Sequence, residues 1–350
     1  MTKPTKFVLL ALVALTAVAF GIAAFSRLPV PPATVGGGFG GTPSALPIYD
    51  SGMPAFQGIT KWWNTPDGQP LTPESLKGKV VLVDFWTYSC INCIRTYPFL
   101  RLMQERYADQ GLVIVGVHTP EFAFEADPAN VGPEIAKNGL KYPIALDPKY
   151  ATWNAYGNSY WPAEYLFDRQ GRLRETHFGE GDYDASEAAI RSLLAEADVA
   201  LAPAGEPVAT PDFSLIGTRE TYFGLGRGSA FMDRTGAEGE PHTYQAAAAV
   251  AADRWTAGGV WKFEREYAEA DSKDAVFAFN VQAGALHIVL SSDDGQDKRI
   301  EVSVDGGAPQ EMTVNAATLY TVARFPNGGR HTVRIRIVDP GVRFYAATFS

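Results

Sequence analysis

The segment from residue 80 to residue 100 constrains the fold of this chain more than any other, because it holds both of its cysteines. An apolar run at residues 80–85, interrupted only by Asp84, is typical of a buried parallel strand. A turn follows, and Cys90 then begins a segment with helical spacing, which brings Cys93 to the same side one turn later. The pattern predicts a strand, a turn and a helix with Cys90 at the helix N-terminus.

That position favours a reactive thiol at Cys90. Unpaired backbone N–H groups and the positive end of the helix dipole stabilise a thiolate there. Cys93 is then placed as a resolving partner. An acidic residue inside a buried strand is costly unless it has a partner or a task, so Asp84 is a further candidate functional residue.

Other roles are open to a Cys-x-x-Cys pair. It can supply half of a zinc site, but the chain has no further cysteine and no nearby histidine pair, so no metal site is expected. It can form a structural disulfide, although closing so short a loop contributes little stability. A thiol peroxidase is a third alternative, since Thr87 and Cys90 match part of the peroxiredoxin pattern, with Val83 where that pattern has proline.

The segment resembles the active site of the thioredoxin superfamily, in which Phe-Trp precedes the cysteine pair. The resemblance implies that Asp84 accepts a proton from Cys93. It also implies that Pro162 is cis and packs beside the cysteine pair. Trp86, Trp161 and Pro162 are the expected substrate contacts, and no cofactor is expected beyond the redox-active disulfide. The sequences Trp-Thr-Tyr-Ser-Cys-Ile-Asn-Cys at residues 86–93 and Val-His-Thr-Pro-Glu-Phe at residues 117–122 are also similar to the extracytoplasmic region of DipZ-type proteins. These are relatives of the TlpA and DsbD thiol-disulfide proteins.

Further acidic and imidazole side chains are candidates for proton transfer. His118 and Glu121 follow an expected strand at residues 112–117, at the carboxyl edge where open α/β sheets place their sites. Glu164, two residues after Pro162, is predicted to point to the same face as that proline.

The N-terminal residues predict an export segment. Lys3 and Lys6 precede residues 7–25, which carry no charge and would span about 28 Å as a helix. We therefore expect an anchor at residues 1–27, with the bulk of the chain extracytoplasmic, in the periplasm or on the outer face of the membrane. Residues 28–47 are rich in proline and glycine and predict a tether.

Two domains are expected after the tether. Strands and helices alternate over residues 48–200, which predicts an α/β thioredoxin-like domain that closes with a helix at 187–197. Residues 201–211 are an expected linker. Period-two alternation at 300–305 and 333–337 then predicts an all-β sandwich over residues 212–350, of the jelly-roll type.

The second domain is similar to the C-terminal module of DipZ-type proteins, which resembles carbohydrate-binding domains. Sugar binding needs exposed aromatic faces. The candidates for glycan contact are Tyr222, Trp255, Trp261 and Tyr267.

The resemblance implies a membrane-anchored thiol-disulfide oxidoreductase that reduces disulfides in extracytoplasmic proteins. One anchor cannot conduct electrons, so a separate membrane donor of the DsbD/CcdA type is expected as a partner. The alternative is a binding protein that recognises an envelope partner or glycan and uses the thioredoxin-like domain as a scaffold. The net charge of -9 argues against a nucleic-acid partner.

Overall fold

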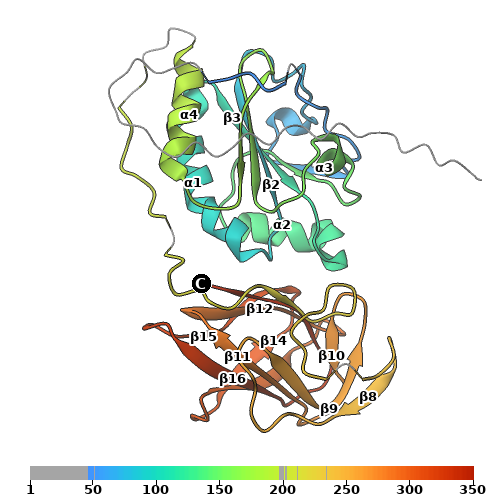
Figure 1. Cartoon of the computed structure of the whole chain (residues 1–350). Coiled ribbons are helices and arrows are strands. Elements are labelled where there is room, and N and C mark those ends of the chain that lie inside the picture. The colour runs from blue at the N-terminus through green and yellow to red at the C-terminus, as the bar shows by residue number, and fades with distance from the viewer. Residues whose placement is uncertain (1–45, 51, 197–200, 202, 211, 234) are drawn as a thin grey trace, which may run out of the picture. The chain divides into compact units, whose positions relative to one another are not determined.

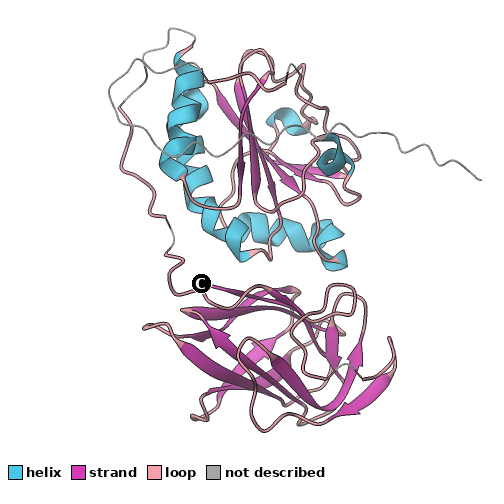
Figure 2. Ribbon diagram, in the orientation of Figure 1, coloured by secondary structure: helices cyan, strands magenta, loops and turns pink. Residues whose placement is uncertain are grey.

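The computed structural model describes residues 46–350 except 51, 197–200, 202, 211 and 234. The described residues belong to one compact unit. Their strands form a six-stranded mixed sheet and an eleven-stranded antiparallel sheet (Figures 1 and 2). The expected anchor at residues 1–27 lies outside the described residues. Within the described part, no helix has the length and apolar character needed to cross a bilayer.

The six-stranded sheet has its most buried strand near the centre. The strand order is β1-β4-β3-β2-β5-β6. The bounds are Lys61–Trp63 (β1), Val80–Trp86 (β2), Leu112–His118 (β3), Ile144–Leu146 (β4), Ala163–Phe167 (β5) and Leu173–Phe178 (β6). β2, β3 and β4 run parallel, while β5 lies antiparallel to β2 on its other side. All seven residues of β2 are buried, as its continuous apolar run predicts.

Helices cover both faces of this sheet (Figure 2). They are Ile91–Tyr107 (α1), Pro128–Lys137 (α2), Ala151–Ala155 (α3) and Tyr183–Ala195 (α4), with short 3-10 helices at Pro66–Gly68, Ala108–Gln110 and Ala123–Ala126. Leu82 of β2 shares one apolar cluster with Leu100 of α1 and Leu193 of α4. On the opposite face, Phe85 packs with Trp153 of α3. Because β2 alternates between these clusters, Asp84 faces the side that α1 and α4 cover.

The closing helix begins earlier than the expected 187–197. α4 starts at Tyr183, whose ring stacks on Phe99 of α1 with centroids 4.9 Å apart. This contact between distant segments stabilises a first turn that shows no apolar period in the sequence.

The second sheet folds into a β-sandwich around one core. Its strands are Thr221–Tyr222 (β7), Pro241–Tyr244 (β8), Trp255–Phe263 (β9), Ala268–Ala270 (β10), Val276–Gln282 (β11), Ala285–Ser292 (β12), Lys298–Val304 (β13), Gln310–Val314 (β14), Thr318–Arg324 (β15), Arg330–Ile337 (β16) and Val342–Phe349 (β17). β9 pairs with β11 along its first half and with β10 along its second. Gly259 lies between the halves with a φ of +84°, a conformation that glycine adopts readily.

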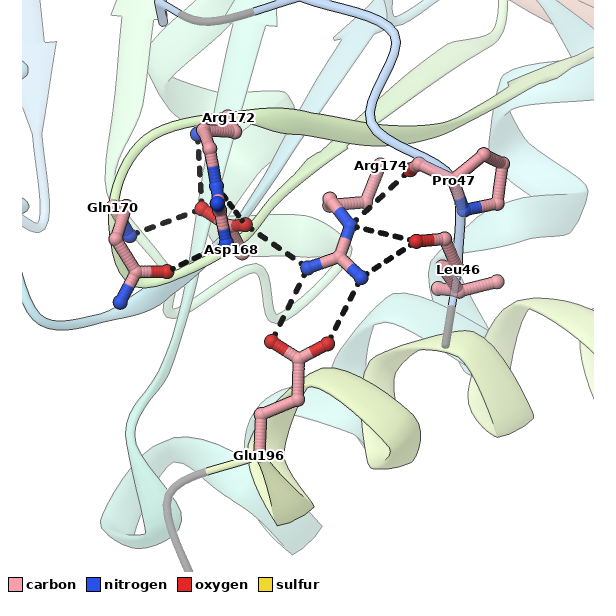
Figure 3. A network of polar contacts seen from close by, with 7 residues as sticks. All are labelled: Leu46, Pro47, Asp168, Gln170, Arg172, Arg174 and Glu196. Atoms are coloured by element: carbon pink, nitrogen blue, oxygen red, sulfur yellow. Dashed lines mark hydrogen bonds and ion pairs between the residues drawn. The ribbon is translucent and has the colours of Figure 1, made fainter. Parts of the chain in front are cut away.

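A buried arginine ties β6 to the start of the described chain (Figure 3). The Arg174 guanidinium donates to the Leu46 carbonyl over 2.6 Å, to Asp168 over 2.9 Å and to Glu196, just after α4, over 2.9 Å. Asp168 also accepts from Arg172 over 2.8 Å. Arg174 and Asp168 are both buried, whereas Arg172 is partly exposed. Arg174 therefore neutralises a buried carboxylate and joins three segments of the domain.

We expect Arg174→Met to lower the free energy of unfolding by about 3 kcal/mol, because it removes one partner of a buried ion pair. Arg172→Met is the matched control. It removes an exposed partner of the same Asp168 carboxylate and is expected to cost less than about 1 kcal/mol. Urea unfolding followed by tryptophan fluorescence measures both. Equal losses in the two variants would contradict the role given to Arg174.

Candidate active site

The two cysteines differ in exposure. Cys90 is the N-cap of α1 and is half-buried, whereas Cys93, one turn into the helix, is fully buried. Both thiols are free, and the backbone N–H of Cys93 donates to Sγ of Cys90 over 3.4 Å. N–H donors at a helix N-terminus interact favourably with negative charge. Cys90 is the sulfur that a partner molecule can reach, and it lies at the N-terminus of α1.

Cys93 needs a base before it can react. Burial raises the pKa of its thiol well above the ordinary value, and the hydrogen bond and charge of Cys90 raise it further. The group is therefore a thiol at neutral pH, and only the thiolate is a good nucleophile. Asp84 lies on the face of β2 that packs against Cys93, between Leu82 and Trp86.

Asp84 has the properties of such a base. It is fully buried, and burial raises the pKa of its carboxyl group from 3.8 to about 7. Neither carboxyl oxygen has a hydrogen-bond partner among the described residues. A carboxyl group with a pKa near 7 can both take up and release a proton under the same conditions.

The turn between β2 and α1 is held by Glu125, which is not among the site residues predicted from the sequence. The hydroxyl of Ser89 donates to Oε1 over 2.6 Å, and the backbone N–H groups of Glu121 and Phe122 donate to Oε2 over 2.6 and 2.9 Å. Glu125 is fully buried, and burial raises its pKa to about 7. No motif in the sequence marks it, because it is one of several acids in this segment and lies in the short 3-10 helix Ala123–Ala126.

His118, at the end of β3, holds the same turn from the other side. The backbone N–H of Tyr88 donates to Nε2 over 3.3 Å, and the ring stacks on the Tyr88 ring with centroids 5.6 Å apart. Burial lowers the pKa of His118 to about 3. Burial thus keeps this histidine neutral, and a role of His118 in proton transfer stays a prediction.

The loop before β5 has the conformation that the resemblance implies. The Trp161–Pro162 peptide bond is cis. The half-buried Trp161 packs against Trp153 with ring centroids 4.2 Å apart, and its indole N–H donates to the Thr119 carbonyl over 3.0 Å. Trp161 also packs against the same apolar cluster as Cys90. The roles of Trp161 and Pro162 in substrate contact stay predictions.

Comparison with known proteins connects this site to characterised enzymes. Residues 50–194 match the family described as Redoxin, and residues 218–350 match the family described as Thioredoxin like C-terminal domain. Thiol-disulfide oxidoreductase YkuV of Bacillus subtilis is 31% identical over 146 residues, which are 42% of this chain and 96% of YkuV. The chain belongs to the thioredoxin superfamily.

Within this superfamily the chain is also similar to Protein DipZ of Mycobacterium bovis. The two are 42% identical over 246 residues, which cover 68% of this chain and 34% of DipZ. The chain thus spans about a third of the length of that relative. Among solved structures, a thioredoxin-like protein in the oxidised form is 32% identical and covers 42% of this chain and 97% of its own, with a TM-score of 0.38.

Trp86 of the thioredoxin-like motif is not a substrate contact. Its side chain is fully buried, with its ring against Tyr97 and His118. Gly116 makes room for it, since a Cβ at that position would lie 2.9 Å from the indole nitrogen. The expected contact is wrong because the motif gives the order of residues along the chain but not their depth.

The two glutamates expected to transfer protons lie in different surroundings. Glu121 accepts from the Tyr222 hydroxyl over 2.7 Å and from the Arg227 guanidinium over 2.9 Å. Glu121 therefore forms an ion pair with Arg227. Its role in proton transfer stays a prediction. Glu164 is buried and is the cross-strand partner of Asp84. Burial, and then the charges of Asp84 and Glu175, raise its pKa well above the ordinary value.

The β-sandwich buries two of the four aromatic rings expected to contact a glycan. Trp255 and Trp261 are buried in its core, so neither offers the exposed face that sugar stacking needs, and these two expectations are corrected. Tyr222 lies beneath the Arg227 guanidinium, 3.8 Å from its ring centroid, and Tyr267 lies beneath that of Arg343, at 4.8 Å. A cation therefore covers one face of each tyrosine ring, and glycan contact by Tyr222 and Tyr267 stays a prediction.

The sandwich also contains a cavity of about 200 Å³. Its walls include Phe223, Phe231, Trp255 and Phe263. The indole N–H of Trp255 donates to the Ser229 carbonyl, and the hydroxyl of Tyr244, which also lines the cavity, donates to the Thr235 carbonyl. These polar groups are engaged within the protein, which leaves a mainly aromatic surface.

The raised pKa of Asp84 predicts a pH-dependent stability. The folded chain retains a proton that the unfolded chain releases between about pH 4 and pH 7, so this carboxyl group lowers stability as pH rises through that range. We expect the stability of Asp84→Asn relative to the parent to increase by up to about 1.4 kcal/mol per pH unit in this window. Urea unfolding from pH 4 to pH 8 measures it. Asp109→Asn, at an exposed position, is the control, and a parallel pH dependence of Asp84→Asn and the parent would contradict the assignment.

Proposed function

We propose that this chain is a membrane-anchored, extracytoplasmic thiol-disulfide oxidoreductase that reduces protein disulfides. The observation that carries the proposal is the arrangement of a reachable Cys90 at a helix N-terminus, a buried Cys93 and a buried Asp84 with a pKa near 7. The similarity to YkuV and DipZ supports the same chemistry.

The reaction proceeds in two exchanges. The Cys90 thiolate attacks a substrate disulfide, a Cys90–substrate bond forms, and the first substrate sulfur leaves as a thiolate that takes a proton from water. Asp84 then removes the proton from Cys93, whose sulfur attacks Cys90 and displaces the second substrate thiolate. The pair loses two electrons and becomes a disulfide, while the substrate gains them.

A continuing cycle needs a source of two electrons for the oxidised pair. We propose a separate membrane donor of the DsbD/CcdA type, because one apolar segment at residues 7–25 provides an anchor but no electron carrier. The charge-free length of that segment and the two preceding lysines support an extracytoplasmic position of the catalytic domain.

We expect Cys93→Ser to accumulate a mixed disulfide with its substrate, because Cys90 still attacks but nothing displaces the second substrate sulfur. Cys90→Ser is expected to form no such adduct and to reduce insulin disulfides at the background rate. Non-reducing electrophoresis, with and without dithiothreitol, detects the adduct.

The same variants separate the proposal from its main alternative. A Cys90→Ser chain that kept every phenotype of the parent in cells would favour the binding protein, in which the thioredoxin-like domain is a scaffold. Labelling of Cys90 in intact cells with a maleimide that cannot cross the membrane tests the location. Protection of Cys90 until the cells are lysed would contradict an extracytoplasmic site.

A further inference from the structure

A row of titratable side chains leads away from Asp84 across neighbouring strands. In the register of the sheet, Asp84 of β2 faces Glu164 of β5, and Glu164 faces His177 of β6. Directly opposed residues on antiparallel strands have Cβ atoms about 5 Å apart. Glu175 lies two residues before His177 and therefore on the same face of β6. Four titratable groups thus lie side by side on the face covered by α1 and α4.

Exposure increases along this row. Asp84 is 0% exposed and Glu164 is 4% exposed, whereas Glu175 and His177 are partly exposed. Glu164, Glu175 and His177 line one small cavity of about 10 Å³, together with Leu82 and residues of α4. A cavity of that volume holds about one water molecule. The row therefore connects the buried base to the surface of the domain.

No structural role explains these acids. Among the described residues, both carboxyl oxygens of Asp84, Oε2 of Glu175 and Nε2 of His177 are buried without a hydrogen-bond partner. Burying carboxyl groups in this way costs free energy. The buried carboxyl groups therefore lower the stability of the fold. Their arrangement in a row is suited to passing protons from one side chain to the next.

We propose that Glu164 and Glu175, together with His177, carry protons between Asp84 and solvent during thiol-disulfide exchange at Cys93. The proposal rests on the function proposed above and names groups that act through Asp84. Asp84 itself has no exposed atoms, so a proton that it takes from Cys93 needs a way out before the next cycle.

The transfer balances as follows. When Cys93 attacks the mixed disulfide, its proton goes to Asp84, the Cys90–Cys93 bond forms and the substrate thiolate leaves. Asp84 then passes the proton to Glu164. A neutral carboxyl group accepts on one oxygen and donates from the other, so Glu164 moves a proton onward without carrying net charge through the buried site. Glu175 and His177 release it to solvent, from which the substrate thiolate takes up one proton.

The surroundings of the row are compatible with this path. The other described titratable or charged side chains that interact with its members are Cys93 and Tyr97 of α1, Tyr142 before β4, Asp182, and Tyr183 of α4. Burial raises the pKa of each of these tyrosines, so they are neutral. None of these five groups is a lysine or an arginine that would hold the acids permanently ionised.

The test is steady-state reduction of insulin by the full chain in the presence of dithiothreitol, from pH 5 to pH 9, in light and in heavy water. Glu164→Gln keeps the shape of the side chain but cannot pass a proton on. We expect it to lower turnover about tenfold, within the range for a lost proton-transfer group, and to increase the solvent isotope effect. Glu175→Gln is expected to lower turnover about threefold with the same change in isotope effect.

Two controls keep the result specific. Glu105→Gln, at an exposed position on α1, is expected to match the parent. The rate at which iodoacetamide alkylates Cys90 is expected to stay the same in every variant, because the first exchange does not use the row. If Glu164→Gln does not fold, Glu175→Gln and His177→Asn decide the question, since both positions are partly exposed.

The outcomes separate the two proposals. Turnover and isotope effects equal to those of the parent in Glu164→Gln and Glu175→Gln would overturn the relay and leave the proposed function intact. The same holds for a loss of turnover with an unchanged isotope effect, which would indicate a structural role. A parent chain without turnover would overturn the proposed function, and the relay with it.

Discussion

A carboxyl group buried without a partner, on the strand that faces a buried thiol, is the constraint on which this site depends. Asp84 lies near the middle of β2, a strand with seven buried residues, and its oxygens have no hydrogen-bond partner among the described residues. Such burial is unfavourable and raises the pKa of Asp84 to about 7. The same burial that costs stability therefore provides a base that titrates near neutral pH.

The two sulfurs of the site differ in exposure and therefore have different roles in the proposed reaction. Cys90 is partly exposed at the start of α1, while Cys93 is enclosed and must be deprotonated from within. The turn that separates β2 from Cys90 is held by Glu125 and His118 from two different segments. An exposed sulfur is thus positioned by buried contacts, so access for a substrate does not require a loosely held loop.

Much of this site can be predicted from local sequence. The strand, the turn and the helix around Cys90 and Cys93 follow from the apolar run and the spacing of the residues, and the resemblance to the thioredoxin superfamily implies the cis bond at Pro162. How deeply a given side chain is buried is harder to predict from local sequence. The sequence predicts a substrate contact at Trp86 and a glycan contact at Trp261, but tertiary packing buries both side chains completely.

Pairing between distant segments is the part that local sequence does not determine. Asp84, Glu164 and His177 become neighbours only through the register of three strands, which long-range contacts set. Glu125 can hold the turn before Cys90 only because its own segment folds back onto that turn. Similarly, the first turn of α4 depends on the stacking of Tyr183 on Phe99.

The reduction potential of the Cys90–Cys93 pair tests the account most directly. It is obtained by equilibrating the full chain with glutathione or dithiothreitol buffers and counting free thiols. We expect one two-electron transition with a potential below about −230 mV, in the range of reducing thioredoxin-like proteins. A value near about −120 mV would make the pair an oxidant, and a pair that exchanged with neither buffer would be a structural disulfide; either result would contradict the account.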